Sequence, residues 1–105
     1  MNELKQHGID VELDPEVAKG HYSNLAIISH STSEFIIDFA SLLPGMPKAA
    51  VNSRIILTPE HAKRLLLSLQ DNVTRYESNV GKIEIGKPSP KNEDLVFGMG
   101  PKGLA

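Results

Sequence analysis

The sequence lacks cysteine and has no long hydrophobic run. Without cysteine the fold contains no disulfide, no thiolate nucleophile and no Cys-ligated zinc. Small secreted chains more often carry disulfides, so we expect this protein to be cytoplasmic. Residues 1–11 mix charged side chains with few apolar ones and do not form the hydrophobic core of a signal peptide. No apolar run approaches the roughly 20 residues that cross a bilayer, so we expect no membrane association.

The chain also has little excess charge of either sign. Its formal net charge is -2, which argues against a dedicated nucleic-acid binder, because phosphate contacts need a clustered positive field. A modest basic cluster is expected around the last strand and the start of the helix: Lys48, Arg54, Lys63 and Arg64. Glu60 lies among them, and no exposed aromatic pair is expected for base stacking. A nucleic-acid-binding accessory module is therefore only the alternative interpretation.

The length of 105 residues fits one domain with a thin core. A chain of this size buries only about 60–65% of the surface that it exposes when unfolded, so self-association is an easy way to add burial. We expect one domain over residues 1–81. Residues 82–105 are rich in proline and glycine and are predicted to be a flexible tail with at most one short edge strand, around Ile83 and Ile85.

Alternation of apolar and polar residues predicts strands at 9–13, 22–28 and 49–57. The segment 34–43 fits two structures. Phe35, Ile37 and Phe39 line one face of a strand, whereas Ser31 and Glu34 match a capping box before a helix. We favour the strand, because aromatic and β-branched residues suit a pleated surface and the serine-rich segment before it suits a hairpin.

A long amphipathic helix is predicted after residue 57. Thr58 is a good N-cap, and Pro59 suits the first helical position, where its missing N–H costs nothing. Apolar residues then recur at three- and four-residue steps. This stripe comprises Ala62, Leu65, Leu66, Leu69, Val73 and Tyr76. Gly81 is the expected stop, which gives a helix of roughly 20 residues.

The predicted fold class is α+β, in the order ββββα, with the helix covering one face of a small antiparallel sheet. On strict alternation the more apolar face should lie under the helix: Leu25, Ile27, Phe35, Ile37, Phe39, Val51, Ile55 and Leu57. The opposite face is not properly polar and should be an exposed contact surface. Its candidate residues are Ile28, His30, Ile36, Asp38, Arg54 and Ile56.

These candidates predict a homodimer that packs the second faces together or pairs edge strands. Asp38 and Arg54 share that face on strict alternation and are expected to form an ion pair. Alternatively, the tail or the segment 1–20 folds over the face and covers it within one chain.

Several motifs match the letters of known sites without their context. Residues 98–103 read G-M-G-P-K-G, but no helix follows to bind a pyrophosphate. His7, His21, His30 and His61 show no metal-ligand spacing. The serines around His30 lack a nucleophile elbow. We therefore expect no catalytic, metal or cofactor site, and no enzyme.

Six short motifs, taken in their order along the chain, resemble those of a known family. They read Y-S-N-L at 22–25, I-S-H-S at 28–31, E-F at 34–35, D-F at 38–39, L-P-G at 43–45 and R-I-I-L-T-P-E-H-A-K-R at 54–64. Together they resemble a family of short prokaryotic proteins that is classed only as a domain of unknown function. The resemblance covers about residues 12–76. It implies a small cytoplasmic prokaryotic protein and brings no assigned functional residues. We expect a non-enzymatic, homo-oligomeric protein-interaction module.

Overall fold

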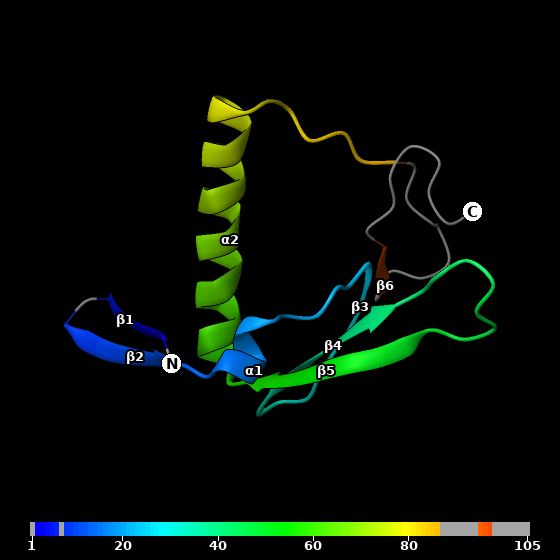
Figure 1. Ribbon diagram of the computed structural model, residues 1–105, viewed down its shortest axis with the longest axis horizontal. Coiled ribbons are helices and arrows are strands. Elements are labelled where there is room, and N and C mark those ends of the chain that lie inside the picture. The colour runs from blue at the N-terminus through cyan, green and yellow to red at the C-terminus, as the bar shows by residue number, and fades with distance from the viewer. Residues whose placement is uncertain (1, 7, 87–94, 98–105) are drawn as a thin grey trace.

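The computed structural model describes residues 2–6, 8–86 and 95–97. Its elements follow one another as β1 Asn2–Gln6, β2 Ile9–Leu13, α1 Pro15–Ala18, β3 Leu25–His30, β4 Phe35–Ser41, β5 Ala50–Leu57, α2 Pro59–Asn79 and β6 Leu95–Phe97. The predicted α+β class, an antiparallel sheet followed by one long helix, is confirmed (Figure 1).

The main sheet has four antiparallel strands in the order β5-β4-β3-β6. The segment that fitted two structures is strand β4, and the helical alternative is wrong. A tight turn joins β3 to β4: the Ser31 N–H donates to the Glu34 carbonyl over 2.9 Å, and His30 pairs with Phe35. β4 lies between β3 and β5, so its backbone groups are satisfied on both sides.

Two expectations about strands need correction. The first predicted strand, β2, pairs with β1 in a separate two-stranded sheet and does not join the main sheet. The fourth strand of the main sheet is β6, which lies within the predicted tail and pairs with β3 at the sheet edge. The tail therefore contributes the one short edge strand that was predicted, but at 95–97 and not at Ile83 and Ile85, since residues 81–86 form no strand. The motif at 98–103 lies outside the described residues.

A polar cluster before β3 holds the start of that strand to its neighbours. Asn24 is buried, and its side chain bonds the backbone of Leu42 twice: Nδ2 donates to the carbonyl over 2.9 Å, and Oδ1 accepts from the N–H over 2.8 Å. The Ser41 hydroxyl donates to the Tyr22 carbonyl over 2.7 Å, and Asn52 Nδ2 donates to the same carbonyl over 3.0 Å. The Y-S-N segment therefore has a structural role.

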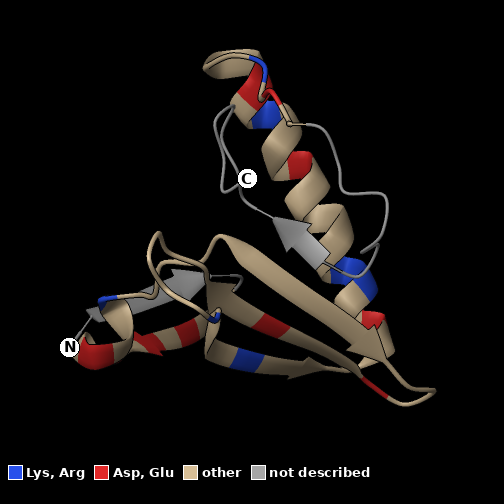
Figure 2. Cartoon of the chain, turned by 90° about the vertical axis from the view of Figure 1, so that its right-hand side faces the viewer, with Lys and Arg blue, Asp and Glu red and all other residues tan. Residues whose placement is uncertain are grey.

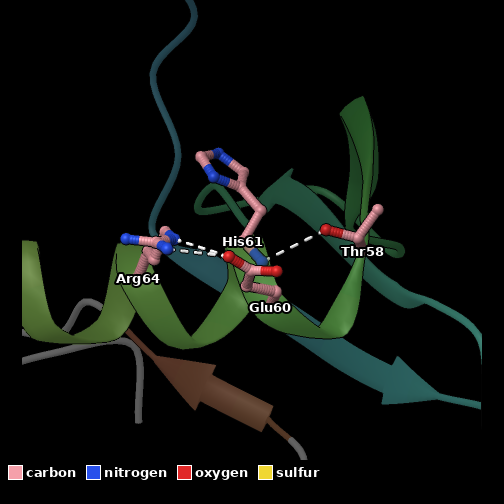
Figure 3. A network of polar contacts seen from close by, with 4 residues as sticks. All are labelled: Thr58, Glu60, His61 and Arg64. Atoms are coloured by element: carbon pink, nitrogen blue, oxygen red, sulfur yellow. Dashed lines mark hydrogen bonds and ion pairs between the residues drawn. The ribbon is translucent and has the colours of Figure 1, made fainter.

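Helix α2 begins and ends as the sequence predicts. Thr58 Oγ1 accepts a hydrogen bond from the His61 backbone N–H over 3.1 Å, with Pro59 at the first position. Figure 3 shows this cap beside the pair that Glu60 forms with Arg64. Val80 is the C-cap, and Gly81 follows it. The cap satisfies one of the free N–H groups of the first turn, and the acidic Glu60 suits the positive end of the helix dipole.

The helix does not cover the sheet as expected. α2 has no buried residue and rises from the end of β5 away from the strands (Figures 1 and 2). Only Thr58 separates Leu57 from Pro59. A helix that folds back over its sheet normally needs a connection of two to six residues, and one residue is too short for that reversal. The buried apolar residues among those described are only Leu25 and Ala40.

Candidate interaction surface

The strand register divides the six predicted surface residues between the two faces of the sheet. Ile36 pairs with Ile56, and Asp38 pairs with Arg54, so these four residues share one face. Ile28 pairs with Ile37 and His30 pairs with Phe35. Residues that pair directly point to the same side, and neighbours along a strand alternate. Ile28 and His30 therefore lie on the opposite face, and the predicted single surface is wrong.

The error has two structural causes. Alternation defines which residues of one strand share a face, but the turn sets the phase between strands. The turn after His30 places Ile28 beside Ile37, not beside Ile36. In β5 a bulge leaves Asn52 out of the residue-to-residue register with β4, so Val51 pairs with Ala40 and changes face.

The face that holds Asp38 is interrupted by charge. Arg54 binds Asp38 with two parallel hydrogen bonds, Nε to Oδ1 over 2.7 Å and Nη2 to Oδ2 over 2.8 Å. The predicted ion pair is confirmed. The hydrogen bonds from Arg54 lower the pKa of Asp38, partial desolvation opposes them, and the Arg54 charge adds to the lowering. The same pair raises the pKa of Arg54. This geometry holds β4 against β5.

The other face is more continuously apolar. Ile28, Ile37 and Ile55 form a row across the three strands, and Phe35 and Leu57 lie beside it. Ile28 and Ile55 are exposed, while Ile37, Phe35 and Leu57 are half-buried. The His30 ring stacks on Phe35 with a centroid distance of 5.2 Å. This face carries the stronger apolar surface of the sheet.

The larger apolar surface lies on α2, where sequence reasoning expected a core. Leu66 is 62% exposed, Leu69 58% and Val80 69%. The polar side of the helix is satisfied within the helix itself, because Asn72 Nδ2 donates to the Ser68 carbonyl and Thr74 Oγ1 donates to the Gln70 carbonyl. The signal that could have revealed this exposure is the single residue between β5 and α2.

The four basic residues of the alternative interpretation do not form one free cluster. Arg54 is paired with Asp38, and Arg64 Nη2 lies 2.7 Å from Glu60 Oε2. Lys48 precedes β5 and Lys63 follows it, so a strand of about 25 Å separates them. Figure 2 shows blue and red segments mixed along the chain. These four residues together therefore offer phosphates no single basic surface.

Residues 2–6, 8–86 and 95–97 contain no cluster of three histidine, aspartate or glutamate side chains that could hold a metal ion. Among the helices of this same described part, none is long and apolar enough to cross a membrane.

Sheet and helix together define a small α+β protein whose apolar surfaces extend well beyond what one chain buries. The chain belongs to the family described as protein of unknown function (DUF3467), which matches residues 1–85. The match confirms the resemblance to a domain of unknown function and extends beyond residues 12–76. Neither the curated proteins nor the solved structures gave a match.

Proposed function

We propose that this protein is a non-enzymatic, homo-oligomeric protein-interaction module. The observation that carries the proposal is its exposed surface. The chain exposes 9060 Å², whereas a compact monomer of 11.5 kDa exposes about 5,800 Å². The surplus of about 3,000 Å² belongs to one chain and is at least as large as the ~1,000–2,500 Å² that each subunit of an obligate homodimer buries.

The shape of the chain supports the same proposal. The radius of gyration is 16.0 Å, while a compact domain of about this length has a value near 13 Å. Exposed apolar residues continue along α2, including Leu65, Leu67 and Tyr76. A contiguous apolar surface of this extent on a small chain marks a protein contact site.

A non-enzymatic, cytoplasmic role belongs to the proposal as well. The one ion pair that shifts pKa values among the described residues, Asp38 with Arg54, joins two neighbouring strands, which supports a structural use of those charges. The absence of cysteine supports a reducing compartment. The resemblance to short prokaryotic proteins supports a prokaryotic origin.

The test is the mass of the protein in solution. Multi-angle light scattering over a 100-fold range of concentration should give an integer multiple of 11.5 kDa, falling toward one chain on dilution. Small-angle scattering on the same samples should show a particle that is more compact for its mass than one chain, whose radius of gyration is 16.0 Å. A single-chain mass at every concentration would overturn the proposal.

A further inference from the structure

We propose that α2 pairs with α2 of a second copy of this chain, antiparallel, with Lys63 of each subunit facing Glu77 of the partner subunit. The inference rests on the proposed self-association and specifies its interface. It starts from a row of residues on α2 and its C-cap that we call the seam: Ala62, Leu66, Leu69, Val73, Tyr76 and Val80.

The spacing of the seam is that of a coiled-coil contact. Its steps are four, three, four, three and four residues, which is the a/d pattern with Leu66, Val73 and Val80 at a and the others at d. The described chain leaves this row open, since every seam residue other than Ala62 is at least 37% exposed. The a/d spacing is typical of a row that packs against another helix.

The ion pairs within α2 lie off the seam. Glu60 bonds Arg64, and Arg75 Nη2 lies 3.7 Å from Asp71 Oδ2. In the heptad these four occupy outer positions b, f, c and f. Lys63 and Glu77 occupy e positions, directly beside the seam. They are the only charged residues at the flanking e and g positions of α2, so they set the orientation of a partner.

Full overlap of two seams also determines the register of an antiparallel pair. Leu66 then meets Tyr76 of the partner subunit, and Leu69 meets Val73 of the partner subunit, with the two-fold axis near residue 71. In this register Lys63 lies within about 3 Å along the axis of Glu77 of the partner subunit. The symmetry repeats the pair, which gives two opposite-charge contacts.

A parallel pair offers no such match. Each e position then faces the g position that lies five residues earlier in the other chain. This places Lys63 near Thr58 of the partner subunit and Glu77 near Asn72 of the partner subunit. Glu77 already accepts a hydrogen bond at Oε2 from the Ile83 N–H over 2.9 Å. Its second oxygen can accept from a lysine at the same time. Charge complementarity therefore favours a second copy of this chain whose α2 runs antiparallel to the first.

The test uses two charge reversals, alone and mixed. Lys63→Glu places two like-charge contacts in its own dimer, and so does Glu77→Lys. We expect each variant to dimerise about tenfold more weakly. Mixed in equal amounts, the two variants form a heterodimer in which both contacts are again opposite, so the mixture should recover wild-type dimerisation. Arg75→Glu and Asp71→Lys change the net charge equally on the outer face and should leave dimerisation unchanged.

A second measurement does not depend on charge. Because the chain has no cysteine, Lys63→Cys and Glu77→Cys each introduce one unique thiol. The antiparallel register keeps the two copies of residue 63 about 24 Å apart, so a mild oxidant should crosslink the mixture of the two variants and not Lys63→Cys alone. Crosslinking of Lys63→Cys with itself, or no recovery in the charge-reversal mixture, would overturn the antiparallel pairing while the wild type still associates. A wild type that stays monomeric would overturn the proposed function as well.

Discussion

The strands β3–β5 and the helix α2 are both ordered by backbone hydrogen bonds but differ in what they bury. The strands meet through paired residues and the polar cluster around Asn24, and the described buried residues, Leu25 and Ala40, lie among them. α2 is capped by Thr58 and Val80 and has ion pairs along its surface, yet it has no buried residue. The comparison separates local order, which hydrogen bonds and capping supply, from the apolar burial that stabilises a fold.

The largest expected effect follows from removing the apolar surface of the helix. Leu66→Asp combined with Leu69→Asp should cost about 4 kcal/mol of association, a ~1,000-fold rise in the dimer Kd, because both side chains lie at the centre of the seam. Analytical ultracentrifugation measures this loss. Ser68→Asp with Thr74→Asp adds the same charge on the polar side and should leave the mass unchanged. Equal masses for the two double variants would contradict a role for the seam.

The next effect concerns the sheet. Asn24→Ala removes both partners of the Leu42 backbone from a buried position, which should lower the free energy of unfolding by about 2–3 kcal/mol. Urea denaturation measures the change. Asn52→Ala loses hydrogen bonds from an exposed side chain and should cost about 1 kcal/mol or less. An Asn24 variant as stable as the Asn52 variant would show that the polar cluster does not hold the sheet.

A smaller effect is expected at the junction of the two regions. Thr58→Ala removes the acceptor for the His61 N–H and should lower stability by about 1 kcal/mol. Thr58→Ser keeps a hydroxyl acceptor and should retain most of the stability. Thermal unfolding followed by circular dichroism distinguishes the two variants. Identical midpoints would mean that the cap contributes nothing to the helix.

The smallest effect is a pH dependence on the charged face of the sheet. Because Arg54 lowers the pKa of Asp38 in the folded protein, the pair stabilises the fold above the unfolded pKa of about 4. That stabilisation is lost as the pH falls through the lower folded pKa. Urea unfolding at decreasing pH should therefore show the difference between wild type and Asp38→Asn shrinking in acid.

The control for this pH dependence uses the partner. In an Arg54→Gln background the cause of the lowered pKa is absent, so Asp38→Asn should change the acid dependence much less. An unchanged acid dependence in that background would assign the effect to another carboxylate.

Much of the fold could be predicted from local chemistry. The cap at Thr58, the proline at the first helical position and the stop at Gly81 predict α2 almost to its ends. Alternation in β4 and β5 predicts both strands and the pair between Asp38 and Arg54. Each of these features depends on residues close in sequence or on a strict period of two, which a single sequence displays directly.

The candidate surface was harder to predict, because it depends on relations between segments. The hairpin turn after His30 and the bulge at Asn52 place Ile28 and Val51 on faces that alternation does not predict. A three-residue strand far along the chain, β6, completes the sheet in place of β2. Short segments carry too little periodicity to reveal which edge they join.

The sequence by itself determined the class of the fold, the bounds of its long helix and the charged pair between two strands, because capping is local and strict alternation places Asp38 and Arg54 on one face. Only the tertiary structure decided where the apolar surfaces lie. A single residue joins β5 to α2, so the helix leaves the sheet instead of covering it, and its apolar stripe stays exposed. Burial depends on the direction in which an element leaves its neighbour, and no pattern within either element contains that direction.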